Sequence, residues 1–140
     1  MRRLFGGRTA GARITESFMY TIYKETTFSG AHRLREYKGR CEALHGHNWK
    51  VRAYVSSGEL DELGMVMDFK ELSKALEDAA SHLDHKYINE VPPFDTINPS
   101  AENIARFFYD ELSARLKNSR AGIEKVMIWE SESSCAIYQP

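Results

Sequence analysis

The chain has 140 residues, a formal net charge of −1 and a hydrophobic content of 42%. This length suits one domain with a single core, and the near-neutral charge offers no basic surface for nucleic acid. No apolar run approaches the roughly 20 residues that cross a bilayer, and two cysteines make no disulfide framework, so we expect a reduced, cytoplasmic protein that binds neither nucleic acid nor membrane.

Residues 1–15 differ in composition from the rest of the chain. They contain four arginines and three glycines but no acidic residue. Arginine without acid is typical of transit peptides, whereas the glycines and the weak apolar face disfavour an amphipathic targeting helix. We therefore predict a disordered N-terminal extension over 1–15 and one folded domain over residues 16–140.

Two strands are expected in the first half of the domain. Residues 18–28 and 48–57 alternate in side-chain character and are rich in aromatic and β-branched residues. The segment between them, 29–44, is polar and contains glycine, which predicts a loop that carries His32 and Cys41.

Two helices follow. Asp68 is expected to cap the first, and Asp68 with Glu71 resembles a capping box. The second is expected to begin with Asn98 as its cap and Pro99 at its first position, and to end before residue 118. The apolar positions recur at helical spacing: Leu72, Leu76, Ala79 and Leu83 in the first helix, and Ile104, Phe108, Leu112 and Leu116 in the second.

Two short strands, 123–130 and 135–138, complete the chain, and Cys135 is expected in the core. The order β-β-α-α-β-β predicts an α+β fold, in which two helices cover one face of an antiparallel four-stranded sheet. Nothing in the pattern closes this sheet. Its two unpaired edges favour pairing with further copies of the chain.

Three histidines form the candidate metal centre. His45 and His47 lie two residues apart at the start of a strand, so their imidazoles project from the same face. His32 follows the preceding strand pattern. Three neutral imidazoles are a common catalytic Zn²⁺ set that leaves a fourth position open. The alternative is a group of ordinary polar histidines; a cupin site is disfavoured because the glutamate it needs is replaced by lysine and valine at 50–51.

Other candidate residues have two interpretations each. Cys41 lies in a polar loop beside the histidines, which favours a reactive thiol over a buried apolar cysteine. Asp84 and His85 follow the first helix and form either a proton-transfer pair or a helix-end electrostatic contact. Glu130 could bind a guanidine-like edge, but from the residues alone we favour an exposed strand position. Glu102 suits the first turn of a helix.

Six ordered segments resemble the 6-pyruvoyltetrahydropterin synthase superfamily, which includes the 6-carboxytetrahydropterin synthases of queuosine biosynthesis. They are Phe-Ser-Gly-Ala-His at 28–32, Cys41 with His-Gly-His-Asn at 45–48, Gly-Met-Val-Met-Asp-Phe at 64–69, Leu-Asp-His at 83–85, Asn-Pro-Ser-Ala-Glu-Asn at 98–103, and Glu-Ser at 130–131. Each motif alone is weak, but six in family order are specific. Residues 1–15 match nothing in the family.

The resemblance implies a fold, an assembly and a metal. The fold is the tunnelling fold, whose four-stranded sheets close into barrels as trimers that stack into a homohexamer, with active sites between subunits. The metal is zinc, on His32, His45 and His47.

The resemblance also implies site residues. Cys41 becomes the proton-abstracting base, with Asp84 and His85 as its partner pair. Glu130 corresponds to the glutamate that anchors the pterin. Glu102 corresponds to a helix-start acid that reaches the pterin from a neighbouring subunit.

The family resemblance leaves the reaction partly open. Three residues separate Cys41 from His45, as in the bacterial carboxytetrahydropterin type, whereas the animal enzymes have five. Glu42 also creates Glu-x-x-His-Gly-His, the signature of a folate-pathway variant that uses glutamate in place of cysteine. We therefore expect a zinc-dependent carbon–carbon lyase acting on 7,8-dihydroneopterin triphosphate, with Cys41 or Glu42 as the base. Its products would be 6-carboxytetrahydropterin and acetaldehyde, or 6-hydroxymethyl-dihydropterin.

Two alternatives are a triphosphate-eliminating 6-pyruvoyltetrahydropterin synthase and a non-catalytic metal or pterin binder. The complete set of Cys41, Asp84 and His85 argues against a binder, which needs none of them. The cationic candidates for binding the triphosphate are Lys24, Arg33, Lys38, Arg40 and Lys86.

Overall fold

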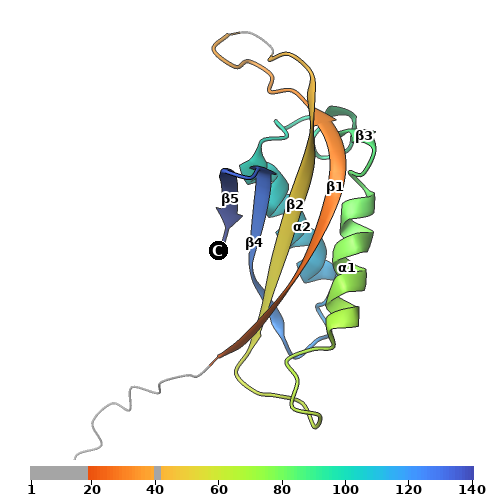
Figure 1. Cartoon of the computed structure of the whole chain (residues 1–140), viewed down its shortest axis with the longest axis vertical. Coiled ribbons are helices and arrows are strands. Elements are labelled where there is room, and N and C mark those ends of the chain that lie inside the picture. The colour runs from red at the N-terminus through yellow and green to blue at the C-terminus, as the bar shows by residue number, and fades with distance from the viewer. Residues whose placement is uncertain (1–18, 40–41) are drawn as a thin grey trace, which may run out of the picture.

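The computed structural model describes residues 19–39 and 42–140. In these residues one sheet is covered on one face by two helices (Figure 1), which confirms the predicted α+β fold. The elements in chain order are β1 (Tyr20–His32), β2 (His45–Ser57), α1 (Phe69–Ser81), β3 (Lys86–Tyr87), the 3₁₀ helix η1 (Ile88–Glu90), α2 (Ala101–Arg115), β4 (Gly122–Ser131) and β5 (Ser134–Tyr138). Within this part of the chain, no helix is both long and apolar enough to cross a membrane.

The sheet has five strands in the order β3-β1-β2-β4-β5, one more than predicted. The additional strand, β3, pairs with β1 in parallel through two residues, Gly30 with Lys86 and Ala31 with Tyr87. A two-residue strand is too short to produce an alternating sequence pattern, which explains why it was missed. The other neighbouring pairs are antiparallel.

The long β1–β2 hairpin extends beyond the predicted strands. β1 continues through His32 and β2 begins at His45, so the prediction that His32 lies in a loop is wrong. The polar residues after Phe28 remain in the sheet because β2 pairs with them along their whole length, ending with His32 opposite His45. Long-range pairing here overrides the local preference of glycine and serine for turns.

The first helix begins as predicted. The side chain of Asp68 caps α1 by accepting a hydrogen bond of 2.8 Å from the backbone N–H of Lys70. This is a simple N-cap rather than the reciprocal capping box expected with Glu71, because the capped N–H belongs to the second helical residue.

The second helix begins two residues later than predicted. Ser100, not Asn98, is the N-cap of α2, and it accepts a hydrogen bond from the N–H of Asn103 at 3.2 Å. Asn98 instead pairs with the backbone of Arg35: it accepts from the N–H at 2.8 Å and donates to the carbonyl at 3.0 Å. The side chain therefore joins the residues after β1 to the segment before α2.

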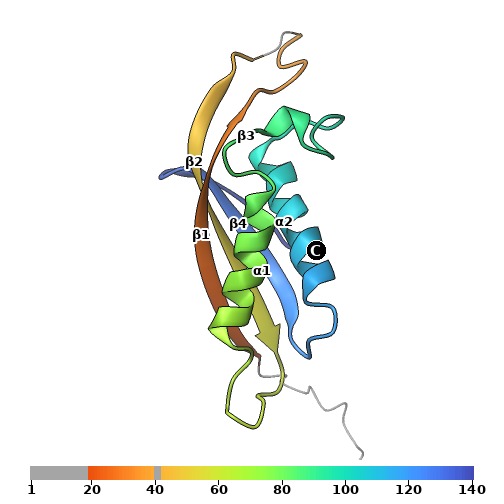
Figure 2. The ribbon, with the colours of Figure 1, turned by 90° about the vertical axis from the view of Figure 1, so that its right-hand side faces the viewer.

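The core lies between the sheet and the two helices, which run along one face of it (Figure 2). The predicted apolar stripes of both helices are buried there. At one end of the core, Phe28 of β1 and Trp49 of β2 lie opposite each other in register and stack with ring centroids 6.1 Å apart. On the same face, His47 lies two residues from Trp49 in β2, and His32 lies four residues from Phe28 in β1, after Gly30. The histidines therefore lie at the end of the core.

The other sheet face carries Lys50, Arg52 and Tyr54, which alternate with buried residues of β2. The cations lie against aromatic rings: the Lys50 Nζ is 4.2 Å from the centre of the Trp129 ring. Cys135 of β5 pairs with Trp129 and is exposed, so the prediction of a core cysteine is wrong. A short apolar pattern does not tell which face of an edge strand a residue occupies.

Candidate metal centre and substrate cavity

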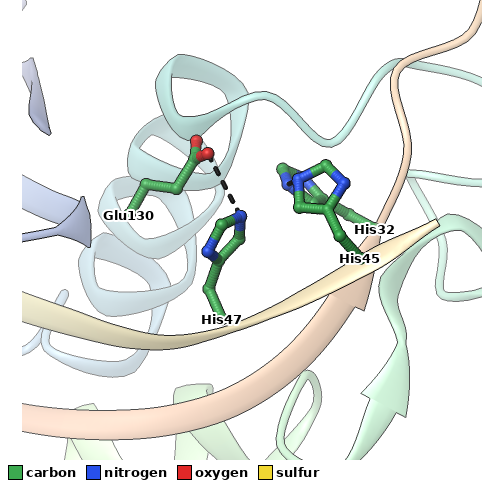
Figure 3. Close-up of side chains that lie close together, drawn as sticks. All are labelled: His32, His45, His47 and Glu130. Atoms are coloured by element: carbon green, nitrogen blue, oxygen red, sulfur yellow. Dashed lines mark hydrogen bonds and ion pairs between the residues drawn. The ribbon is translucent and has the colours of Figure 1, made fainter. Parts of the chain in front are cut away.

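The three predicted metal ligands come together with one carboxylate. His32 ends β1, His45 and His47 begin β2, and Glu130 lies near the end of β4 (Figure 3). One ligating atom from each of the four side chains lies within 4.8 Å of all the others. The antiparallel register, with His45 opposite His32, produces this convergence.

Backbone carbonyls fix which nitrogen of two histidines faces the centre. The Nδ1 of His32 donates to the carbonyl of Pro99 at 2.7 Å, and the Nδ1 of His45 donates to the carbonyl of Ala43 at 2.8 Å. A carbonyl only accepts, so each Nδ1 carries the proton and each neutral ring presents the lone pair of its Nε2. Such outer contacts orient metal-binding histidines.

The two Nε2 atoms of His32 and His45 lie 3.0 Å apart. Two lone pairs at this separation repel unless a cation lies between them. Nitrogens bound tetrahedrally to one Zn²⁺ at 2.0–2.1 Å are about 3.3 Å apart, so the spacing fits a shared metal. Burial, more than any other cause, lowers the pKa of His32 from its usual value, and the neighbouring histidines lower it further. The ring is therefore held neutral, as a metal ligand must be.

The third nitrogen lacks a hydrogen bond. The Nε2 of His47 is buried and has no hydrogen-bond partner within the described residues, although the Oε1 of Glu130 lies 3.1 Å away. The two atoms are close enough for an ion pair, but no hydrogen bond joins them. A buried ring nitrogen left without a partner costs free energy, and a metal ion would satisfy it.

Trp49 packs against two histidines of the metal centre. Its fully buried ring lies nearly perpendicular to those of His32 and His47, at centroid distances of 4.9 and 5.2 Å. The indole Nε1 donates to the carbonyl of Gly30 at 3.2 Å. The histidines are therefore supported by a packed aromatic layer, which restricts the movement of their rings.

A cavity of about 210 Å³ lies beside the histidines. It contains three of the predicted functional carboxylates, Glu42, Glu102 and Glu130. Glu102 is in the first turn of α2, and Glu42 accepts a long hydrogen bond of 3.4 Å from the N–H of Leu34. Glu102 thus borders the cavity of its own chain, and its reach to the pterin of a neighbouring subunit stays a prediction.

Asp84 and His85 lie elsewhere, beside the edge of β1 that faces away from β2 and β4. The Oδ1 of Asp84 accepts from the N–H of Ser29 at 2.9 Å, and the N–H of His85 donates to the carbonyl of Ser29 at 2.6 Å. The Nε2 of His85 is 3.7 Å from the Oδ2 of Asp84, and the imidazole is exposed. Both residues lie beyond the end of α1 at Ser81, so helix-end electrostatics does not explain them.

Neither Asp84 nor His85 borders the cavity that holds the carboxylates. His85 instead borders a second hollow, of about 500 Å³, together with Ser29, Asn48 and one histidine of the metal centre, His47. The backbone of His85 has a φ of 55°, which is uncommon for a residue with a side chain. Two anchors to Ser29 hold this conformation.

Sequence reasoning missed the residues that support the centre. The carbonyls of Pro99 and Ala43 have no sequence signal, because any residue supplies a carbonyl. Trp49 could have been found, since it continues the alternation of His45 and His47 on the same face of β2. The predicted base Cys41 lies outside the described residues.

Comparisons with known proteins agree with the predicted family. A family model described as 6-pyruvoyl tetrahydropterin synthase matches residues 21–140. A protein of Synechocystis sp. named 6-carboxy-5,6,7,8-tetrahydropterin synthase is 37% identical over 125 residues, covering 86% of this chain and 93% of that protein. The human 6-pyruvoyl tetrahydrobiopterin synthase is 31% identical over 150 residues, covering 96% and 95%. The solved structure of the Caenorhabditis elegans 6-pyruvoyl tetrahydropterin synthase gives a TM-score of 0.76 at 26% identity, over 87% of this chain and 96% of that one.

Proposed function

The chain belongs to the 6-pyruvoyl tetrahydropterin synthase family, and from this membership we propose that it is a zinc-dependent lyase acting on 7,8-dihydroneopterin triphosphate. Its products would be 6-carboxy-5,6,7,8-tetrahydropterin and acetaldehyde, as in queuosine biosynthesis. The relative at 37% identity bears the name of that synthase, which supports this reaction over others in the family.

One observation carries the proposal. Imidazole nitrogens of His32, His45 and His47 converge beside a cavity that also holds carboxylates. Zinc held by the three histidines would act as a Lewis acid toward the hydroxyl groups of the substrate side chain. A purely structural zinc site would not need an adjoining cavity lined by carboxylates.

The carboxylates suit recognition of a pterin. Glu130 can accept two parallel hydrogen bonds from the 2-amino group and the ring N–H of the pterin, a geometry that fixes the ring in its plane. Glu102 borders the same cavity and is assigned to the same edge of the ring. Both are acceptors, and the pterin edge consists of donors.

Proton transfer is assigned to Cys41 or Glu42 as the base, with His85 supplying or accepting a second proton and Asp84 orienting it. Glu42 borders the cavity, which supports its participation. Asp84 and His85 would come from a neighbouring subunit of a homohexamer built from two trimers. Sedimentation analysis tests this assembly, and a stable, active monomer would contradict it.

A second candidate reaction is side-chain cleavage to 6-hydroxymethyl-7,8-dihydropterin, the folate-pathway product. The adjacency of Cys41 and Glu42 favours it as a second activity, because both family signatures are then present within residues 41–47. The triphosphate-eliminating reaction is the third candidate, and the human relative at 31% identity bears the name of such a synthase.

Turnover with product identification tests the proposal. The purified protein is incubated with 7,8-dihydroneopterin triphosphate, and the pterin product is identified by mass. His47→Ala should remove bound zinc and activity together. His82→Ala is the matched control, since this histidine contacts Arg115 at 3.2 Å and lies outside the cavity. Full zinc occupancy in His47→Ala, or no turnover by the unmodified protein, would contradict the proposal.

A further inference from the structure

Glu130 belongs to the histidine cluster itself as well as to the cavity. Its carboxylate oxygen is 3.1 Å from the buried Nε2 of His47, without forming a hydrogen bond to that nitrogen. Its ligating atom is within 4.8 Å of those of all three histidines. In Figure 3 its carboxylate points toward the same space that the histidine rings enclose.

The other two carboxylates of the cavity are not part of this cluster. Glu42 contacts the N–H of Leu34, and Glu102 is exposed at the start of α2. Glu130 differs because β4 pairs with β2 in a register that places Trp129 opposite Lys50, which brings the next residue of β4 alongside the histidine end of β2. Strand pairing, rather than a flexible loop, therefore sets its position.

We propose that Glu130 is the fourth ligand of the metal in the substrate-free protein, and that the same carboxylate leaves the metal when it binds a pterin. This inference rests on the proposed function. Three imidazoles and one carboxylate are a complete four-ligand set for Zn²⁺. The free protein would thus hold its metal in a closed site, and substrate recognition would open it.

The two roles of the carboxylate exclude each other. A carboxylate that accepts two parallel hydrogen bonds from a pterin uses both of its oxygens, so neither remains free for the metal. A pterin bound at Glu130 should therefore change the ligands of the metal even when the pterin has no side chain that could reach the metal.

Cobalt substitution tests whether Glu130 binds the metal, because the visible absorption of Co²⁺ reports its ligands without any need for turnover. Co²⁺ is titrated into metal-free wild-type protein and into Glu130→Gln, Glu130→Asp and Glu132→Gln. Glu132→Gln removes the same charge from the turn that follows β4 and should match the wild type in affinity and spectrum. Glu130→Gln should bind Co²⁺ at least about 10-fold more weakly and with a changed spectrum.

Glu130→Asp separates ligation from charge. It keeps the negative charge but withdraws the carboxylate by one methylene group, so a ligand role predicts a changed spectrum here too. An unchanged Co²⁺ spectrum in both Glu130 variants would overturn the proposal, whatever happens to affinity. Thermal unfolding of the metal-free variants checks that they fold; the Glu130 side chain is 34% exposed, which favours tolerance of both changes.

Unsubstituted pterin, which has no side chain, tests whether the Glu130 carboxylate leaves the metal when a pterin binds. Its binding to the Co²⁺ protein is followed by its fluorescence. Bound pterin should convert the wild-type spectrum to that of Glu130→Gln, and an unchanged spectrum with pterin bound would overturn this part. If the wild type binds no metal at all, the proposed zinc function fails; if it binds metal without the Glu130 effects, only this inference fails.

Discussion

Gly30 determines how closely the Asp84–His85 segment approaches β1, and replacing it with alanine should destabilise the fold. A Cβ at this position would lie 2.8 Å from the Cδ1 and 3.2 Å from the Cγ1 of Ile88, and 3.4 Å from the carbonyl oxygen of Leu83. Ile88 is fully buried in η1, so its side chain has little room to move. The glycine is required here for space, not for an unusual backbone angle.

The expected cost follows from overpacking. Inserting one methyl group into a packed core costs about 1–3 kcal/mol, and the loss of unfolded-state entropy on replacing glycine offsets about 0.4–1 kcal/mol of it. We therefore expect Gly30→Ala to lower the free energy of unfolding by roughly 1–2 kcal/mol. Gly46→Ala is the matched control, because its Cβ would meet nothing closer than 3.9 Å, and it should be neutral or slightly stabilising.

Urea unfolding of the metal-free protein measures both variants, and a double-mutant cycle tests the cause. Ile88→Val removes the atom that lies 2.8 Å from the added Cβ and alone should cost about 0.5–1.5 kcal/mol. The Gly30→Ala/Ile88→Val protein should be destabilised by less than the sum of the two single variants, and the difference should be at least about 0.5 kcal/mol. Strict additivity, or equal stability of the two alanine variants, would refute the steric explanation.

Three further predictions concern the proposed chemistry and its linkage to stability. Cys41→Ala should abolish carboxytetrahydropterin formation and leave some hydroxymethyl-dihydropterin formation, while Glu42→Ala should do the reverse; if the first change removes both products and the second neither, Glu42 has no catalytic role. Burial lowers the pKa of His32 from 6.5, so the unfolded chain binds the proton more readily. The free energy of unfolding of the metal-free protein should therefore be highest above about pH 6.5 and should fall as the pH decreases below that value. Urea midpoints at several pH values measure this dependence. An equal decrease in His32→Gln would contradict the assignment to His32. His85→Gly should retain or gain up to about 1 kcal/mol of stability, because it relieves a φ of 55°, yet lose activity by about 100-fold or more; a destabilised but active variant would refute both parts.

The part of the metal centre that the sequence predicts is its local part. His45 and His47 share a strand, and a period of two is enough to place them on the same face. The position of His32 beside them depends on its pairing with His45, which is 13 positions later in the chain, and a strand pattern interrupted by serine and glycine does not predict this pairing. The residue pattern offered His32 as a third ligand because it follows a strand pattern, and the family resemblance implied the same three histidines, but the register that joins them comes from the structure.

Glu130 shows the same limit more strongly. Considered as a single residue on a short strand, it is an ordinary exposed glutamate, and its membership of the histidine cluster depends on the register of β4 against β2. Asn98 shows the converse error. Asparagine followed by proline is a sound helix start, but here the side chain of Asn98 bonds to Arg35, far away in the sequence, and Ser100 caps the helix instead.

The separation of His85 from the cavity that holds Glu102 and Glu130 is the basis of the last prediction. His85 lies at the β3–β1 edge of the sheet, whereas this cavity lies beside His32 and opens toward β4, β5 and α2. If sheets join edge to edge in a closed ring, the β3–β1 edge of one subunit meets the β5 edge of the next, and His85 completes a neighbour's site. His47→Ala and His85→Gly are each inactive alone, but subunits mixed in equal amounts should recover activity. An active site needs its metal centre from a His85→Gly subunit and its imidazole from a neighbouring His47→Ala subunit. Each requirement is met with a chance of one half, so about a quarter of the wild-type activity is expected. Co-expression with two different affinity tags isolates the mixed oligomers, and their complete inactivity would show that each active site is built from a single chain.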